Sequence, residues 1–194
     1  MQKTRSTKLL KMIILALLGT VSLALIFLNF PLPMLPPFLK VDFSDVPALI
    51  ASFIFSPLAG VVVIAIKNVL YLLFGFGEPV GVAANFLAGV MFVLPVSLLY
   101  KRYKTTKSIV SGLVTGTIIM AIGMSVLNYF VLLPIYAMFM GMEEFSSIEA
   151  VRQVVVIGVL PFNIIKGIIV GALFIPLFKK MRTWIERERT TFAS

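Results

Sequence analysis

The sequence predicts an all-α integral membrane protein, a bundle of about six helices that forms one transmembrane domain over residues 1–194. Of the 194 residues, 60% are hydrophobic and 13% are charged, and the mean hydropathy is +1.07, so the chain needs lipid as its solvent. A spanning helix takes about 20 mostly apolar residues, and the length allows roughly six. In addition, 13 of the 17 Lys and Arg residues form three short clusters beside apolar runs, at residues 3–11, 101–107 and 179–189.

The first apolar run predicts a spanning helix over residues 9–28. Its length and the lack of a small-residue cleavage site distinguish it from a secretory signal peptide. The segment from Asn29 to Phe38 contains four prolines, which fix φ and remove backbone donors, so the helix cannot continue through it. We expect an ordered, apolar loop on the outer side of the membrane.

A second helix is predicted over residues 46–55 and a third over residues 57–75. Ser44 and Asp45 carry side-chain oxygens suited to capping the second helix. One unbroken helix is the alternative, but a break at Pro57 places all three basic clusters on one side of the membrane, as expected for cytoplasmic loops. The second helix is too short to span alone, so we expect it to be partial, tilted or sheltered by its neighbours.

The remaining apolar runs predict helices over residues 80–100, 107–140 and 149–180. Because basic residues collect on the cytoplasmic side, both termini are expected there. Two glycine pairs, Gly112 with Gly116 and Gly167 with Gly171, have the spacing that allows close helix packing, most simply within the bundle. Six of the eight acidic residues then fall in the outward loops, namely Asp42, Asp45, Glu78, Glu143, Glu144 and Glu149.

The composition also excludes several functions. The chain has no Cys and no His, which removes thiol nucleophiles, imidazole bases and the commonest zinc ligands, so neither a metal nor a cofactor is expected. It has no Gly-rich nucleotide-binding loop, so energy from ATP must come from partner subunits. The net charge of +9 comes from basic clusters that would lie at lipid headgroups, so it does not indicate binding of nucleic acid. Apart from Glu149 at the very start of the last helix, no acidic residue falls within the predicted spans, which disfavours ion-coupled transport.

Six polar residues stand inside apolar segments, where losing water is costly unless the side chain meets a cavity, a partner or a ligand. Asn163 and Lys166 are three residues apart, so they share one helix face and can contact one ligand. Asn128 lies late in the helix over residues 107–140, on the same predicted outer half of the membrane. The full set is Lys67, Asn68, Asn85, Asn128, Asn163 and Lys166.

Amide donors, amide acceptors and an ammonium group near the outer surface suit a flat heterocycle with carbonyl and imide edges. Aromatic side chains at Phe38, Tyr129 and Phe162 are candidates to cover its faces. The alternative is that the polar groups only hydrogen-bond between helices. For Lys67, the stem can also snorkel, or the ammonium can pair with an acidic loop residue.

Five strings of the sequence carry a resemblance to a known family. In them, and over nearly the whole chain, the protein resembles the riboflavin-specific substrate-binding components of energy-coupling-factor (ECF) transporters. The strings are FPLPMLPP (residues 30–37), VDFSDVPA (41–48), ANFLAG (84–89), LNYFVLLP (127–134) and PFNIIKG (161–167).

The resemblance implies a six-helix fold whose Pro-rich first loop helps to close a riboflavin pocket. By analogy, Asn128, Asn163 and Lys166 hydrogen-bond the pyrimidine edge of the isoalloxazine ring. Asn85 and the backbone near Leu39 and Val41 would meet the ribityl chain. Lys67 and Asn68 are secondary candidates.

The resemblance also implies partners in the bacterial plasma membrane, namely a membrane coupling protein and two cytoplasmic ATPases. The subunit would topple in the bilayer to release the vitamin inward. Docking in the family uses small residues of the first helix, and here Ala16, Thr20 and Ala24 stand four apart, with Thr20 in place of the expected alanine. Capture of another vitamin, such as a pyridoxine-like or thiamine-like compound, and a membrane-embedded enzyme or scaffold are the competing hypotheses.

Overall fold

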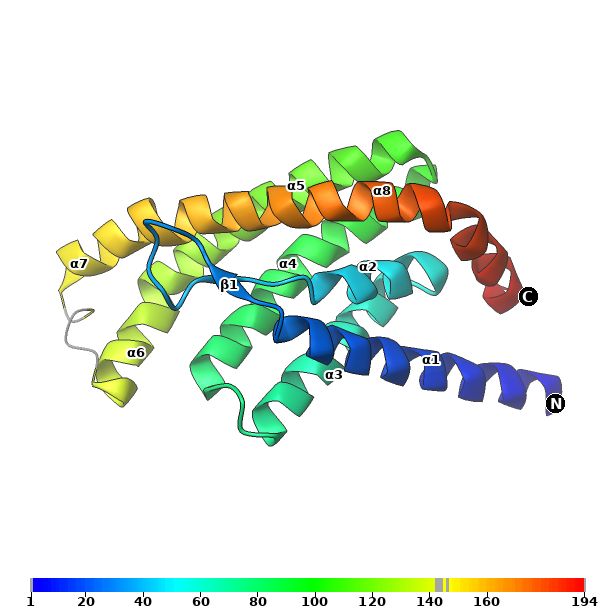
Figure 1. Ribbon diagram of the computed structural model, residues 1–194, viewed down its shortest axis with the longest axis horizontal. Coiled ribbons are helices and arrows are strands. Elements are labelled where there is room, and N and C mark those ends of the chain that lie inside the picture. Colours follow the sequence, from blue (N-terminus) through cyan, green and yellow to red (C-terminus); the bar gives the residue numbers. More distant parts are fainter. Residues whose placement is uncertain (1, 142–144, 146, 194) are drawn as a thin grey trace.

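The computed structural model describes residues 2–141, 145 and 147–193, and these residues are helical almost throughout (Figure 1). Glu143 and Glu144, expected in an outward loop, lie outside the described residues. Along the chain the elements are α1 (Gln2–Ile26), β1 (Phe30–Pro31), β2 (Lys40–Val41), α2 (Asp45–Ile54), α3 (Pro57–Leu73), α4 (Pro79–Tyr103), α5 (Thr106–Leu127), η1 (Asn128–Leu132), α6 (Leu133–Met140), α7 (Ile148–Gln153), η3 (Val154–Val159) and α8 (Leu160–Ala193).

Four helical stretches of the described chain are long and apolar enough to cross a membrane. They are Thr7–Ile26, Pro79–Tyr103, Thr106–Phe139 and Ile148–Phe192. The last two each contain a π-helical segment, η1 or η3, which the sequence patterns did not indicate. The last helix also continues to Ala193, beyond the expected end at residue 180, and an Arg182–Glu186 pair one turn apart supports this extension with an N–O distance of 2.8 Å.

The predicted break at Pro57 is confirmed. Ser56 has an extended backbone (φ −171°, ψ 161°), and its side chain accepts a hydrogen bond from the Ala59 N–H. Pro57 occupies the first helical position, where its missing N–H leaves no bond unmade. All ten residues of α2 are buried, and α2 contacts α1, α3, α4 and α8, so this short helix is sheltered by its neighbours as expected.

The predicted cap of α2 is wrong. Ser44 has helical dihedral angles (φ −66°, ψ −14°) and makes no side-chain cap, and Asp45 is the first residue of the helix instead of an outward-loop residue. The Ser44 hydroxyl instead donates to the Asp42 carboxylate and accepts from the Lys67 ammonium. Hydrogen bonds to charged groups are stronger than a bond from a backbone N–H to a neutral hydroxyl, so Ser44 bonds to Asp42 and Lys67 instead of capping the helix.

The glycine pairs pack helices inside the bundle, which confirms the simpler interpretation of their spacing. A Cβ atom added at Gly112 would lie 2.9 Å from Cα of Val96, and one at Gly116 would lie 2.6 Å from the Phe92 carbonyl oxygen, both in α4. At Gly167 the added atom would meet the Thr117 side chain of α5. Helices α4, α5 and α8 therefore approach one another more closely than larger residues would allow.

The Pro-rich first loop is the one described part with strands. β1 and β2 pair in antiparallel fashion, with Phe30 opposite Val41. The loop folds back against η3, because a Cβ at Gly158 would lie only 3.1 Å from Cδ of Pro36. The Phe38 ring lies 6.0 Å from the Phe145 ring, in an edge-on arrangement. The loop thus covers one end of the bundle.

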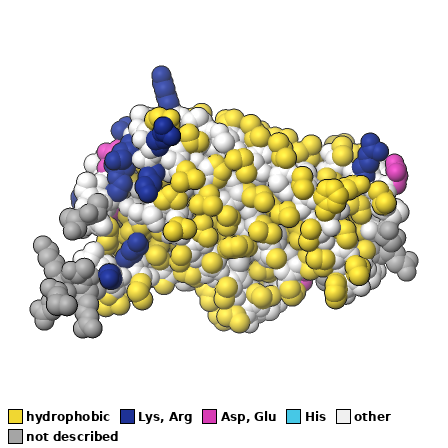
Figure 2. Space-filling view, turned by 180° about the vertical axis from the view of Figure 1, so that it is seen from behind, with side chains coloured by type: hydrophobic (Ala, Val, Ile, Leu, Met, Phe, Trp, Pro, Cys, Tyr) yellow, Lys and Arg dark blue, Asp and Glu magenta, His cyan; other side chains and the backbone are white. Residues whose placement is uncertain are grey.

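Both termini lie at the other end (Figure 1). Figure 2 shows hydrophobic side chains over most of one face, and Lys and Arg side chains gathered mainly at the end that carries the termini. Exposed apolar residues occur along all the long helices, for example Leu17, Val114 and Ile168. A surface this apolar, bounded by cations at one end, is that of a membrane protein.

Candidate functional site

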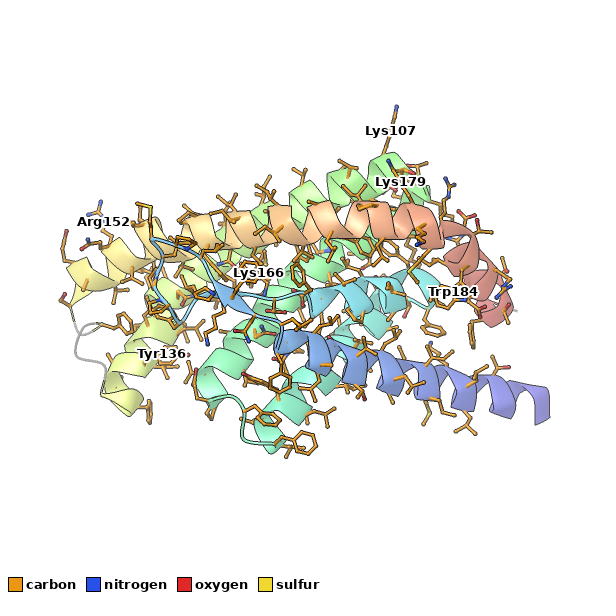
Figure 3. The ribbon with its side chains drawn as sticks, viewed as in Figure 1. Lys107, Tyr136, Arg152, Lys166, Lys179 and Trp184 are labelled. Atoms are coloured by element: carbon orange, nitrogen blue, oxygen red, sulfur yellow. The ribbon has the colours of Figure 1, made fainter. Side chains whose placement is uncertain are left out.

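A polar cavity of about 130 Å³ lies beneath the first loop, between that loop and helices α4, α5, η1, α6, η3 and α8. Figure 3 shows Lys166 on α8 and Tyr136 on α6, two of the residues that bound this region. The cavity is lined by Phe38, Leu39, Lys40, Gly81, Ala84, Asn85, Ala88, Met124, Asn128, Tyr136, Val159, Phe162, Asn163 and Lys166.

Of the eleven substrate-binding candidates from the sequence, seven line this cavity and four do not. Segments more than 120 residues apart therefore meet at one place, since Phe38 and Lys166 belong to the first loop and the last helix. The seven are Phe38, Leu39, Asn85, Asn128, Phe162, Asn163 and Lys166. The four are Val41, Lys67, Asn68 and Tyr129.

Val41 is fully buried in β2, where it holds the loop through its pairing with Phe30. Tyr129 lines a different cavity with Phe130, and their rings lie 4.8 Å apart. Because a helix turns about 100° per residue, Tyr129 cannot share the direction of its neighbour Asn128.

Asn128 and Asn163 have the same local geometry. The Nδ2 of Asn128 donates to the Met124 carbonyl, and the Nδ2 of Asn163 donates to the Val159 carbonyl, each at 2.8 Å. Each amide keeps its carbonyl oxygen and its second N–H for another partner. Both side chains are buried and line the cavity, so a ligand there would meet two fixed amides.

The two π-helical segments position these amides. Asn128 is the first residue of η1, and Asn163 lies one turn after η3. Each segment ends two residues before a proline, Pro134 or Pro161, whose ring cannot fit regular α-helical bonding. Pro95 and Pro176 also lie within predicted helices but in regular α-helix, so a proline alone does not identify a π-segment. Such segments occur frequently at functional sites.

Lys166 belongs to a buried network of alternating charges. Its Nζ donates to Oδ2 of Asp42 at 3.1 Å and lies 3.9 Å from Oδ2 of Asp45. Lys67 donates to Oδ1 of Asp45 at 2.7 Å and to the Ser44 hydroxyl at 2.5 Å. The suggestion that Lys67 pairs with an acidic residue is confirmed. The sequence did not reveal that Asp42 and Asp45 are buried with it.

Asp42 is the charged member of this network that belongs to the loop. Burial by itself raises the pKa of a carboxyl group, but the charges of Lys166 and Lys67 and hydrogen bonds from Ser44 outweigh it and hold the Asp42 pKa well below its ordinary value of 3.8. Asp42 is therefore ionised at neutral pH. It orients Lys166 and leaves other ammonium protons free to contact a ligand.

Asn68 lies outside the cavity although it resembles Asn163. Its Nδ2 donates to the Ile64 carbonyl at 2.8 Å, and its side chain is equally buried. The buried Oδ1 atoms of Asn68 and Asn85 both have no hydrogen-bond partner among the described residues, but only Asn85 lines the cavity. A buried acceptor without a donor is costly, so a ligand hydroxyl at Asn85 would be favoured.

Two polar side chains of the cavity, Lys40 and Tyr136, were not among the candidates of the sequence analysis. The Tyr136 hydroxyl donates to the Glu78 carboxylate, which also accepts from the backbone N–H groups of Val80 (2.8 Å) and Gly81 (2.5 Å) at the start of α4. Glu78 therefore ties α6 to α4 at the cavity. An acidic residue before a proline and a helix was the signal for this cap.

Among the described residues, no group of three or more His, Cys, Asp or Glu side chains is placed to hold a metal ion. Ligand cavities usually measure about 300–1,000 Å³. This cavity of about 130 Å³ adjoins a second one of about 160 Å³, which shares Phe38, Lys40, Gly81 and Asn85 with it.

The small residues proposed for docking lie on one exposed face of α1. Ala16, Thr20 and Ala24 are all exposed, and the Thr20 hydroxyl donates to the Ala16 carbonyl at 3.0 Å. The buried side of α1, which includes Leu15 and Leu23, is distinct from this face, and α1 packs on α2 and α3. The hydroxyl of Thr20 is thus satisfied within its own helix and adds little bulk.

Residues 10–178 match the family described as "ECF transporter, substrate-specific component". The chain is 44% identical over 177 residues to the riboflavin transporter RibU of Staphylococcus aureus, covering 91% of this chain and 93% of that protein. It is 46% identical over 186 residues to the riboflavin transporter FmnP of Bacillus subtilis, covering 94% and 97%.

A solved structure is similar as well. It is described as the S component of a bacterial ECF transporter, shares 43% identity, and covers 92% of this chain and 98% of its own, with a TM-score of 0.78.

Proposed function

The chain belongs to the substrate-specific components of ECF transporters, and we propose that it captures riboflavin on the outer side of the bacterial plasma membrane for ATP-driven import. The observation that carries this proposal is the meeting of three amides and a lysine in one cavity under the first loop. Two of its relatives, each at least 44% identical, are named riboflavin transporters.

The proposed contacts follow from the donors and acceptors present. The pyrimidine edge of the isoalloxazine ring offers two carbonyl oxygens and an imide N–H, which complement the free amide groups of Asn128 and Asn163 and the ammonium of Lys166. The unpartnered Oδ1 of Asn85 would accept from a ribityl hydroxyl. Phe38 and Phe162, on the loop and on α8, would contact the ring faces.

The proposed arrangement in the membrane is a bundle of six membrane-embedded helices with both termini in the cytoplasm. The support is the distribution of charge, since the Lys and Arg clusters gather at the end that carries the termini (Figure 2). The cavity and the first loop lie at the other end, which would then face outward. In this orientation the loop closes over riboflavin from the extracellular side.

The chain would not hydrolyse ATP itself. We propose that a membrane coupling subunit and two cytoplasmic ATPases supply the energy and that Ala16, Thr20 and Ala24 form the docking face on α1. This face is exposed and lined by small side chains, which permits close approach of another helix.

Titration of detergent-purified protein with riboflavin, followed by quenching of the flavin fluorescence, tests the site. Asn163→Ala is expected to weaken riboflavin binding by about 1–3 kcal/mol, roughly 5- to 150-fold, because it removes a hydrogen-bonding partner in a dry cavity. Asn68→Ala is the matched control, since Asn68 is an equally buried amide with the same bond to its own helix but outside the cavity.

The site is refuted if the two variants bind riboflavin equally well. A competition series with pyridoxine and thiamine tests the cargo separately, and displacement of riboflavin by either at equimolar concentration contradicts the proposal. Flavin absorption bands in the purified protein at near-stoichiometric amounts would support it directly.

A further inference from the structure

A second cavity, of about 220 Å³, lies at the end of the bundle opposite the riboflavin site. Its walls come from the α2–α3 connection, the end of α4 and the last turns of α8. Phe53, Phe55 and Pro57 form its apolar part, and Tyr100 lies with them. Nothing in the proposed capture of riboflavin uses this cavity.

The Tyr100 hydroxyl is the unusual group in this second cavity. Tyr100 is only 2% exposed, and its buried hydroxyl has no acceptor for its proton among the described residues, because the neighbouring Arg189 guanidinium can only donate. The ring is held by stacking on Phe53, with centroids 4.1 Å apart. A buried hydroxyl proton without an acceptor is costly, so an occupant of this cavity that accepts a hydrogen bond would be favoured.

Three cations line the same cavity. Lys101 and Lys104 are exposed at its edge, and Arg189 is half-buried, with its guanidinium 6.0 Å from the Tyr100 ring centroid. The described residues place no carboxylate within ion-pair distance of any of the three. The two nearby acids, Glu186 and Glu188, pair with other arginines.

The end of a helix favours cations by itself, and this explains Lys101 and Lys104 at the C-terminus of α4 in part. It does not explain Arg189, which comes from α8, nor the hydroxyl between them that has no acceptor. Lys104 also occupies a left-handed backbone conformation (φ 51°), a position where glycine or asparagine is the usual choice.

We propose that this cavity binds the phosphate group of an anionic membrane lipid, such as phosphatidylglycerol of the cytoplasmic leaflet. Phosphate oxygens would accept from Lys104, Arg189 and the Tyr100 hydroxyl. Phe55 and Pro57 would contact the glycerol and the first methylene groups. The apolar wall favours a lipid over free phosphate, and basic pockets at headgroup depth are known lipid sites. The assignment to the cytoplasmic leaflet rests on the orientation in the proposed function.

The test uses the full-length protein in neutral detergent, titrated with dioctanoyl phosphatidylglycerol, with bound lipid counted by native mass spectrometry. The double variant K104Q/R189Q is expected to weaken lipid binding about tenfold or more, because two charge-assisted bonds are lost. Y100F, which removes only the hydroxyl, is expected to weaken it about threefold. The control R102Q/K107Q removes two cations from the same end that do not line the cavity, and we expect it to bind lipid as the parent protein does.

Riboflavin binding is measured in the same samples. In each variant, unchanged riboflavin binding shows that the protein is folded. If the parent protein itself does not bind riboflavin, the proposed function is contradicted, but the lipid site is not affected. Equal weakening by R102Q/K107Q overturns the lipid site in favour of diffuse surface charge. Equal binding of dioctanoyl phosphatidylcholine, or full displacement of the lipid by millimolar inorganic phosphate, also overturns it.

Discussion

Lys67 and Lys166 are both buried, and each ammonium group is paired with an aspartate, but their surroundings differ. Lys67 is completely buried and sealed among Ser44, Asp45 and the surrounding helices. Lys166 pairs with Asp42 of the first loop but also borders the cavity. Burial of a charged group in an apolar helix therefore does not identify a binding residue. The deciding feature is whether the paired group still faces an open space.

The same distinction separates Asn68 from Asn163. Each amide donates to the carbonyl one helical turn earlier at 2.8 Å, but only Asn163 borders the cavity. We therefore expect the Lys67 side of the molecule to stabilise the fold and the Lys166 side to contact a ligand in the cavity. Three predictions test this division.

The largest effect is expected from Lys67→Met. It leaves the Asp45 carboxylate buried beside only the more distant Lys166, and loss of one partner of a buried pair costs about 3–5 kcal/mol of unfolding free energy. Equilibrium unfolding in mixed micelles of increasing SDS content measures it. The double variant Lys67→Met/Asp45→Asn is expected to recover most of the loss, because no buried charge is then left without its partner. If the double variant is no more stable than Lys67→Met, the pair is not the cause.

A smaller effect, on binding, is expected for Lys166→Met/Asp42→Asn. Removing both charges together spares stability, but riboflavin loses a charged hydrogen-bond donor worth about 1.5–3 kcal/mol, or roughly 10- to 150-fold in affinity. Fluorescence quenching measures the affinity, and SDS unfolding measures the stability. For comparison, Lys67→Met/Asp45→Asn is expected to bind riboflavin as the parent protein does. If the two double variants have the same riboflavin affinity and the same free energy of unfolding, Lys67 and Lys166 do not differ in the way described.

The smallest effect is a pH dependence assigned to Asp42. Its pKa is lower in the folded protein than in the unfolded chain, so the unfolded chain binds more protons and Asp42 stabilises the fold fully only above pH 3.8. The contribution declines as the pH falls further, by about 1 kcal/mol at pH 3, since one pH unit corresponds to 1.36 kcal/mol. Unfolding measured at pH 3 and pH 6 tests this, with Lys166→Met/Asp42→Asn as the variant in which this part of the slope disappears.

Much of the local structure could be predicted from the sequence because it depends on local rules. Four prolines end the first helix region, and Pro57 after Ser56 starts α3, because proline fixes φ and donates no hydrogen bond. The three basic clusters follow from the boundary between lipid and water. The sequence singles out the amides of Asn85, Asn128 and Asn163 because an amide inside the membrane is costly to desolvate unless it meets a polar partner or a ligand.

The partners of those side chains could not be predicted in the same way. Asp42 and Lys166 are 124 residues apart, and no local pattern shows that the loop carboxylate reaches the last helix. The capping prediction for Ser44 failed for this reason, since Lys67 and Asp42, which take its hydroxyl, are supplied by the tertiary fold. The positions of Asn128 at this cavity and of Tyr129 at a different one also depend on the helices packed around η1.

The sequence by itself determined that this chain is a helical membrane protein with a Pro-rich loop and a few buried polar groups, because solvent preference and backbone restrictions are properties of individual residues. Only the tertiary structure decided which of those groups are sealed into the fold and which face the cavity. That choice depends on long-range pairing of charges and on the space left between helices, and both arise only when distant segments pack together.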